Sequence, residues 1–385
     1  MPKLIRITTA PLSLKYLLFN QMRYMKENGF EVIMVSSEGK EWPDLIKNEG
    51  CEHRIVHMTR KMTPFTDLKS LWQLYRLFKK EKPDIVHSHT PKAGLLAMLA
   101  AKFAGINIRI HTIAGLRFMT ATGMTRNILV YMEKLTGKAA HYVWPNSNSL
   151  LNYIRQNKLI SENKLQVIGH GSSNGVDLNR FSAYALKTEK LNEIKKLLNY
   201  DESCFYILNM GRIVKDKGID EVLKSFAIVH TENPKLRLIV LGAFEDDLDP
   251  ISDETRAMLK THPAITHIDW SDDVEYFMHL SQLLIHASYR EGFPNTLLQA
   301  GAMNCPIICS AIEGSIDIVT NKETGLVFQP RNADDLLEKL KYALAHAEEM
   351  NCYAINLRTK IEKYFSQQYL HACLKEKYME LLNKN

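Results

Sequence analysis

Short apolar runs alternate with longer segments of helical spacing through the first half of the chain. The expected strands are residues 4–8, 30–36, 84–87 and 106–111. The expected helices are residues 14–28, 42–48, 67–80 and 92–104. Short strands that are apolar throughout are typical of a parallel sheet with helices on both faces. The first half therefore predicts a doubly wound α/β domain.

The second half repeats this arrangement. Its expected strands are residues 205–210, 236–241, 264–268, 283–286 and 306–310, and a helix is expected at 219–230. Glycine, serine and asparagine cluster at 169–175, as in a linker. We therefore expect a first Rossmann-like domain at 1–180, a second at 181–365, and a C-terminal helix at 366–385 that crosses back to the first domain. Ligands of open parallel sheets bind at the carboxyl ends of the strands, so the loops there are the places to look for chemistry.

Charge is distributed unevenly between the two halves. Residues 1–180 contain 26 Lys and Arg against 13 Asp and Glu, whereas the whole chain has a net charge of only +6. A basic half favours contact with an anionic surface: nucleic acid, anionic lipid head groups or a phosphorylated acceptor. A merely solvated basic face is the alternative. The basic residues are dispersed and match no nucleic-acid-binding motif, so we expect no nucleic-acid partner.

The six cysteines, the N-terminal residues and the length of the apolar runs bear on localisation. The cysteines are scattered without a second ligand pair at zinc spacing, which favours free thiols in a reducing compartment. The N-terminal residues do not resemble a signal peptide, and no apolar run approaches membrane-spanning length. We expect a cytoplasmic protein that contacts the inner face of the plasma membrane peripherally at most.

The strongest chemical signal is the segment that joins the expected strand 205–210 to the helix at 219. It contains Gly211, Arg212, Lys217 and Gly218. A strand-to-helix turn presents free backbone N–H groups and a positive helix end, and two cations on the same turn suit a diphosphate. Lys215, on the same turn, is better explained as a solvated residue.

The second signal is the turn that follows the strand at 283–286. Glu291 lies there, where a carboxylate can accept hydrogen bonds from sugar hydroxyls, although a helix-start charge or an ion pair also explains it. Gln299 projects from the same face about two helical turns later and could reach a ribose hydroxyl. The remaining candidate donor contacts on this turn and the start of the next helix are Gly292, Phe293, Pro294, Asn295 and Thr296.

These two segments resemble glycosyltransferase family 4, retaining enzymes of the GT-B fold, in which two Rossmann-like domains face a central cleft. The first segment matches the family pattern G-R-x-x-x-x-K-G. The second matches E-G-F-(G/P)-x-x-x-x-E except that Gln299 replaces the last glutamate. Gly175-Val176-Asp177 followed by Phe181 resembles the interdomain G-V-D-x-x-x-F. The likeness covers nearly the whole chain and is most specific from about 168 to 330.

The resemblance implies a role for each matched residue. Arg212 and Lys217 would bind the donor diphosphate, Glu291 would contact the donor sugar, and Gln299 would hold the ribose more weakly than the family glutamate does. His111 resembles the family histidine that approaches the donor sugar from the acceptor side. With Glu291, Arg212 and Lys217 it completes the expected catalytic set.

The first half supplies the expected acceptor contacts. His89 and Lys92 follow the strand at 84–87, and Arg117 lies in a loop that mixes cations with apolar residues, as a lipid-phosphate interface would. Arg60 and Lys61 are further candidates. His87 with His89, the Asp246-Asp247 pair and the Asp272-Asp273 pair resemble metal motifs only superficially, so we expect no metal and no cofactor beyond the nucleotide sugar.

Together these observations predict a retaining glycosyltransferase. It would move a sugar from a nucleotide diphosphate, such as a UDP-hexose or UDP-N-acetylhexosamine, to a lipid-linked or saccharide acceptor during surface polysaccharide assembly. The family resemblance implies front-face attack beside the leaving diphosphate, which would need no enzymic base. Two alternatives remain open: a non-hydrolysing nucleotide-sugar epimerase, and a non-catalytic nucleotide-sugar-binding partner.

Overall fold

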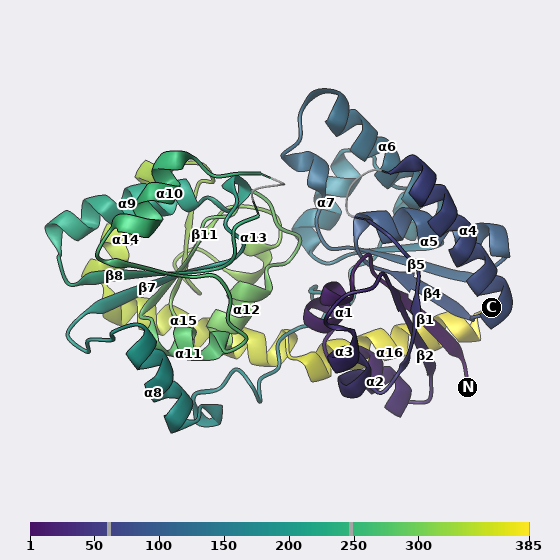
Figure 1. Cartoon of the computed structure of the whole chain (residues 1–385), viewed down its shortest axis with the longest axis horizontal. Helices are drawn as coiled ribbons and strands as arrows, with labels where there is room; N and C mark the ends of the chain where they lie inside the picture. The colour runs from purple at the N-terminus through teal and green to yellow at the C-terminus, as the bar shows by residue number, and fades with distance from the viewer. Residues whose placement is uncertain (60–62, 246–248, 385) are drawn as a thin grey trace. The chain divides into compact units, whose positions relative to one another are not determined.

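The computed structural model describes residues 1–59, 63–245 and 249–384 (Figure 1). The chain forms two compact units: Met1–Asn174 together with the segment from Gln367 onward, and Gly175–Ser366. The first unit thus ends before the expected boundary at residue 180. The reason is local, since the Val176 N–H donates to the Phe365 carbonyl at 2.9 Å and so joins the segment after Asn174 to the second unit.

The first unit is built on a six-stranded parallel sheet in the order β3-β2-β1-β4-β5-β6. Its strands are β1 (Lys3–Ile7), β2 (Glu31–Ser36), β3 (Glu52–Ile55), β4 (Ile85–Ser88), β5 (Ile108–Ile113) and β6 (Tyr142–Pro145). The chain winds outward from β1 to β3 and then restarts beside β1 at β4. The topological switch point therefore lies between β1 and β4, which is where such sheets bind ligands.

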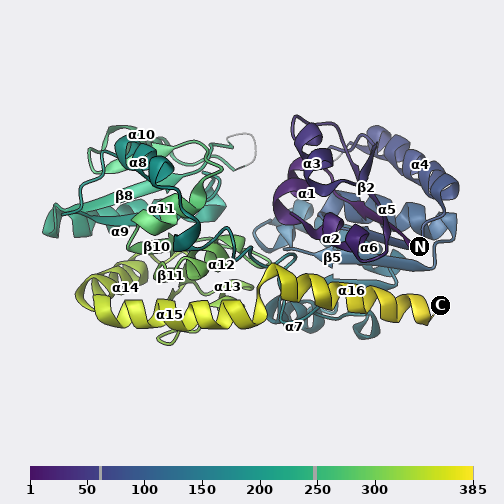
Figure 2. The same ribbon diagram turned by 90° about the horizontal axis from the view of Figure 1, so that it is seen from below.

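Helices cover both faces of this sheet. One face carries α4 (Pro64–Glu81), α5 (Pro91–Ala104), α6 (Gly123–Ala139) and α7 (Asn148–Gln156). The other carries α1 (Pro11–Leu17), α2 (Gln21–Glu27), α3 (Trp42–Glu49) and α16 (Gln367–Asn383). Figure 2 shows α16 running along this unit. Short 3₁₀ turns lie at Arg117–Met119 and Glu162–Lys164.

The expected helix at 14–28 is two helices. The first helix ends at Leu17, and Asn20, in a left-handed backbone conformation (φ 64°), is the residue before the first residue of α2. The buried Glu49 carboxylate then accepts hydrogen bonds from the backbone N–H groups of Asn20 (2.7 Å) and Arg23 (2.8 Å), and so stabilises the start of α2.

The second unit repeats this strand order as β9-β8-β7-β10-β11-β12, and all of its strands are parallel. The strands are β7 (Phe205–Met210), β8 (Leu236–Leu241), β9 (Ile265–Ile268), β10 (Leu283–His286), β11 (Ile307–Ser310) and β12 (Leu326–Phe328). Its switch point lies between β7 and β10. Two six-stranded parallel sheets with helices on both faces confirm the predicted α/β, GT-B fold class.

The helices of the second unit complete two apolar cores, one on each face of the sheet. They are α8 (Thr188–Leu197), α9 (Ile219–Glu232), α10 (Asp253–Thr261), α11 (Val274–Leu280), α12 (Asn295–Ala302), α13 (Ser315–Ile318), α14 (Ala333–Ala345) and α15 (Ala347–Tyr364). The C-terminal helix expected at 366–385 corresponds to α16. It is separate from α15 because Phe365 leaves the helical conformation and its carbonyl accepts a hydrogen bond from the Val176 N–H. No helix among the described residues is long and apolar enough to cross a membrane.

Candidate active site

The two segments predicted to carry chemistry meet at the switch point of the second unit. One follows β7 and contains a 3₁₀ turn, Lys215–Lys217; the other follows β10. The Tyr289 N–H donates to the Asp216 carbonyl at 2.8 Å, and the Arg290 guanidinium pairs with the Asp216 carboxylate at 2.6 Å. These bonds join two loops that lie more than seventy residues apart in the sequence.

Glycines make this close approach possible. A Cβ on Gly218, whose φ is +68°, would lie 2.1 Å from the Ala287 carbonyl oxygen of the other loop. A Cβ on Gly242, at the end of β8, would lie 1.7 Å from the Gly211 carbonyl oxygen. Neither position tolerates a side chain without backbone movement. Gly218 thus lets the two loops approach each other, and Gly242 lets the end of β8 approach the start of the first loop.

Lys217 and Glu291 form an ion pair across the two loops. Ser288 Oγ donates to the same Glu291 oxygen at 3.0 Å, and His286 Nε2 lies 3.5 Å from it. Burial alone would raise the pKa of the Glu291 carboxyl. The Lys217 charge and the hydrogen bonds from His286 and Lys217 outweigh burial and hold that pKa well below its usual range. The side chains of Lys217 and Glu291 are 22% and 20% exposed, so a solute can reach both.

Arg212 contacts a different carboxylate. Its Nη1 pairs with Glu245 Oε2 at 2.5 Å, and its side chain is 43% exposed. The two predicted diphosphate cations are thus held by separate acidic partners. Lys215 is also exposed on this turn, in agreement with its interpretation as a solvated residue.

The remaining donor candidates lie where the chain turns into α12. Gly292 is in close contact with Gly314, since a Cβ on Gly314 would lie 2.1 Å from the Gly292 carbonyl oxygen. The Phe293 ring is buried and packs on Phe365 with ring centroids 5.2 Å apart. Phe293 therefore shapes the turn from inside, and its ring faces the core rather than solvent.

Pro294 precedes the first residue of α12, and Asn295 and Thr296 form the first turn, half-buried. Gln299 is also half-buried on this helix. Across the described part of the chain, its side-chain amide makes no hydrogen bond. The amide is therefore available to a ligand.

The acceptor candidates of the first unit are less accessible. The His111 ring is 2% exposed and packs against α5 where Gly94 leaves room, since a Cβ there would lie 2.3 Å from His111 Cε1. Burial lowers the pKa of His111 to about 4. Lys92, 8% exposed, pairs with Asp67 at 2.7 Å. Arg117 is exposed on its 3₁₀ turn.

His89 belongs to a buried polar network that the sequence did not predict. At its centre is Arg6, fully buried on β1, which donates to His89 Nε2 (2.7 Å), to the Tyr378 hydroxyl (2.7 Å) and to Gln21 Oε1. Because a guanidinium only donates, the Tyr378 hydroxyl gives its proton to His87 Nδ1, and His87 Nε2–H donates to Thr112 Oγ1. Burial and the Arg6 charge lower the pKa of His89.

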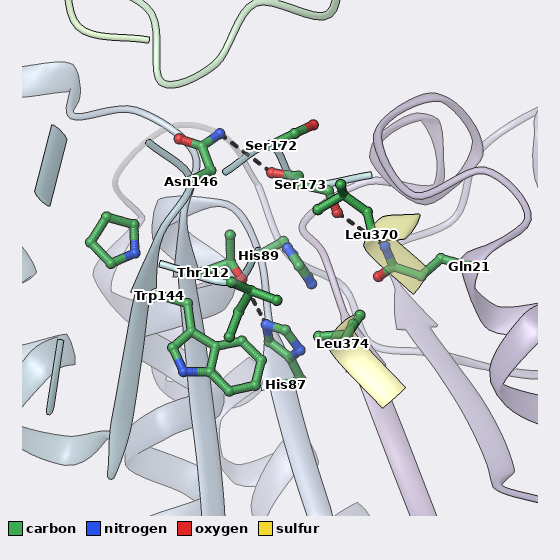
Figure 3. A pocket seen from close by; sticks show the side chains of 12 residues that line it. Gln21, His87, His89, Thr112, Trp144, Asn146, Ser172, Ser173, Leu370 and Leu374 are labelled. Carbon is green, nitrogen blue, oxygen red and sulfur yellow. Dashed lines mark hydrogen bonds between the residues drawn. The ribbon is translucent and has the colours of Figure 1, made fainter. Parts of the chain in front are cut away.

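Figure 3 shows the small cavity beside this network, with Gln21, His89, Trp144 and Asn146 among the residues around it. Its volume of about 20 Å³ suits one ordered water. A charged residue inside an otherwise apolar strand was the sequence signal for this network, but nothing local pointed to its partner from α16.

The residues that superficially resemble metal ligands form hydrogen bonds or ion pairs with other protein groups. Both ring nitrogens of His87 are hydrogen-bonded, Asp273 pairs with Lys190 at 3.1 Å, and the Asp272 carbonyl accepts from Arg180. Arg60, Lys61, Asp246 and Asp247 lie outside the described residues.

Comparison with known proteins identifies the relatives of this chain. The family described as "Glycosyl transferases group 1" matches residues 190–364, and the family described as "Glycosyl transferase 4-like" matches residues 11–149. The capsular polysaccharide biosynthesis glycosyltransferase CapM of Staphylococcus aureus is 34% identical over 384 residues, covering 100% of this chain and 98% of that protein.

Two further matches are more distant. The UDP-Gal:alpha-D-GlcNAc-diphosphoundecaprenol alpha-1,3-galactosyltransferase of Escherichia coli is 26% identical over 359 residues, or 92% of this chain and 90% of that protein. The crystal structure of Anabaena Alr3699/HepE in complex with UDP-glucose has a TM-score of 0.79 at 13% identity, and covers 99% of this chain and 100% of that one. At that identity the likeness concerns the fold alone.

The fold, the paired loops and these matches define a glycosyltransferase of the GT-B class that uses nucleotide sugars. Within that class, the chain belongs to glycosyltransferase family 4.

Proposed function

We propose that this enzyme transfers a hexose or N-acetylhexosamine from UDP to a saccharide carried on a polyprenyl diphosphate, with retention of configuration, in capsule or related surface polysaccharide assembly. The observation that carries the proposal is the Lys217–Glu291 pair on the two adjoining loops of the switch point. A cation suited to a diphosphate and a carboxylate suited to sugar hydroxyls lie side by side, as a nucleotide sugar requires.

The donor would rearrange this pair. Lys217 would turn toward the diphosphate with Arg212, which would leave Glu291, kept as a carboxylate, to accept hydrogen bonds from the sugar. The Gln299 amide would meet the ribose. Gly211, Gly292, Pro294, Asn295 and Thr296 would supply backbone contacts, and Phe293 would support them from the core.

Retention would follow from attack on the face that the diphosphate leaves. The acceptor oxygen bonds to the anomeric carbon while the bond from that carbon to the phosphate oxygen breaks, and the acceptor proton passes to the departing phosphate. Arg212 and Lys217 would stabilise the charge that develops there. On the acceptor side we assign His111, His89, Lys92 and Arg117, the two histidines as neutral hydrogen-bonding groups because burial lowers the pKa of both.

The substrate classes are supported by the relatives. CapM is named for capsular polysaccharide biosynthesis, and the E. coli relative for transfer from UDP-Gal to a diphosphoundecaprenol-linked GlcNAc. These names support a UDP donor and a lipid-diphosphate acceptor for this chain.

A product assay tests the proposal. The purified chain is incubated with single UDP-hexoses or UDP-N-acetylhexosamines and a short-prenyl diphosphate saccharide, and products are followed by mass spectrometry and NMR. We expect a one-sugar mass increase with one donor and an α linkage in the product. Epimerised donor in reactions without acceptor would support the epimerase alternative instead. Donor binding without transfer to any acceptor tested would support a non-catalytic partner.

A further inference from the structure

The outward face of α4 carries large apolar side chains in water. Phe65, Leu68 and Trp72 are 92%, 65% and 55% exposed. Their spacing of three and four residues places them in one stripe, while Leu74 and Phe78 on another side of the helix are buried in the core. The helix is thus apolar on two faces, and only one of them packs against the protein.

Every exposed ionisable side chain on α4 is basic. The four are Lys69, Arg76, Lys79 and Lys80. The two acidic residues of the helix are engaged elsewhere, since Asp67 pairs with Lys92 at 2.7 Å and Glu81 pairs with Lys3 at 3.3 Å. The Arg76 guanidinium lies over the Trp72 ring, 4.7 Å from its centroid, so positive charge and exposed apolar surface are directly adjacent.

Helix α6 has the same character. Met124, Ile128 and Tyr131 are 79%, 39% and 67% exposed. The exposed charged residues of α6 are Arg126, Lys134 and Lys138, and its one carboxylate residue, Glu133, is buried. Both α4 and α6 pack against α5, on the same face of the first sheet (Figure 1).

We propose that the outer faces of α4 and α6 form a docking surface for an anionic lipid membrane. Aromatic and aliphatic side chains that protrude from a helix among Lys and Arg, without exposed acidic groups, are typical of helices that lie in a lipid interface. A folded acidic protein would have to offer matching hollows for Phe65 and Trp72, whereas a headgroup layer accepts them anywhere. The inference rests on the proposed function in one respect, because a lipid-carried acceptor makes the docking useful.

The test is partition of the full chain onto vesicles. We expect binding to phosphatidylglycerol-rich vesicles and weak binding to phosphatidylcholine alone. The variant Phe65→Ser/Leu68→Ser/Trp72→Ser should bind the anionic vesicles at least about a hundredfold more weakly, because three large apolar groups no longer insert. Lys69→Gln and Lys80→Gln should each weaken binding by about fivefold.

The second unit offers a matched control. Trp270→Ser/Ile316→Ser/Ile355→Ser removes three apolar side chains that are 58%, 48% and 58% exposed, and should leave vesicle binding within about twofold. Quenching of tryptophan fluorescence by brominated lipid should disappear in Trp72→Phe and persist in Trp270→Phe. The inference would be overturned if the α4 variant bound like the wild type, if neutral and anionic vesicles bound equally, or if quenching persisted without Trp72.

Activity in detergent separates this inference from the proposed function. With a short-prenyl acceptor, the α4 variant should transfer sugar at the wild-type rate. Wild-type vesicle binding without any sugar transfer would sink the proposed function alone, and sugar transfer without vesicle binding would sink only the docking surface.

Discussion

The switch points of the two units occupy the same place in the same strand order, yet they treat charge in opposite ways. Between β7 and β10, cations and carboxylates pair near the surface, with the Lys217 and Glu291 side chains about one-fifth exposed. Between β1 and β4, Arg6 is fully buried among a tyrosine, a glutamine and a neutral histidine. One site leaves its charges within reach of solvent, whereas the other uses its charge to fix the positions of neighbouring side chains.

The largest expected difference between the two units is in their stability at acidic pH. Burial lowers the pKa of His111 to about 4, and burial with the Arg6 charge lowers that of His371 to about 4. A histidine whose folded pKa lies below its unfolded value contributes stability above about pH 6.5 and loses it as the pH falls toward the folded pKa. Each of these two should therefore cost the first unit about 2 kcal/mol at roughly pH 5.

Other groups act in the same window. The further first-unit histidines with lowered pKa values are His53, His87, His89 and His141. Glu133 opposes them, because burial raises its pKa to about 7 and its contribution is lost as the pH rises. In the second unit, burial also lowers the pKa values of His262 and His279, but these two histidines are half-buried and exposed, respectively, so their contribution should be smaller. The Glu291 pKa lies below its usual range, so the contribution of Glu291 persists until the pH falls below about 4. Urea-dependent hydrogen exchange by peptide should show the first unit opening first at about pH 5, and the reverse order would contradict the comparison.

Removal of an accessible charge should affect catalysis more than folding. Lys217→Ala should lower kcat by about 10²–10³-fold, roughly 3–4 kcal/mol of barrier, because the leaving diphosphate loses a cation. Its free energy of unfolding should change by only about 1 kcal/mol. Lys215→Ala, on the same turn, is the control and should leave kcat within about twofold. Near-normal turnover of Lys217→Ala would remove the basis of the donor site.

Removal of the buried charge should affect folding instead. Arg6→Met leaves the Gln21 and His89 acceptors buried without a donor, which should lower the free energy of unfolding by about 3 kcal/mol. Arg237 on β8 of the second unit is the matched control. Its guanidinium donates to the backbone carbonyls of Pro234 and Leu236, near the start of the strand. Arg237→Met should cost less than about 1 kcal/mol in urea unfolding. Equal losses in the two variants would show that burial of the guanidinium is irrelevant.

The smallest expected effect concerns Gln299. In Gln299→Glu a charge-assisted hydrogen bond to the ribose would replace a neutral one, which should tighten UDP binding by about tenfold, or roughly 1.4 kcal/mol. Isothermal titration calorimetry with UDP and with its 2′,3′-dideoxy analogue checks the origin of the gain. If the analogue gained equally, the ribose assignment of this position would be wrong.

The central strands were predictable from the sequence and the edge strands were less so. The predicted bounds of β7, β8 and β10 match the structure, because each is a mostly apolar run inside the sheet. The three strands that the pattern missed are β3, β6 and β12, and all three lie at sheet edges. An edge strand pairs on one side only, so its residues need less apolar character and give a weaker signal.

The candidate sites also differ in how much of their sequence signal is local. Lys217 and Glu291 were found because each lies in a short motif of glycine and charge, and the sheet then brings the two motifs together. The Arg6 network joins residues of α2, β1, β4 and α16, and Arg6 and Tyr378 are separated by 372 positions. No local pattern encodes such a contact, so only the fold could reveal it.

The place of Tyr378 also has a consequence for the order in which the protein is made. Leu374, Tyr378 and Leu381 close the core of the first unit, although they follow the whole of the second unit in the sequence. All of Gly175–Ser366 is synthesised before them, so the second unit can fold while the first still lacks a helix. A nascent chain that has emerged from the ribosome only as far as Ser366 would therefore hold a finished second unit and an unfinished first unit.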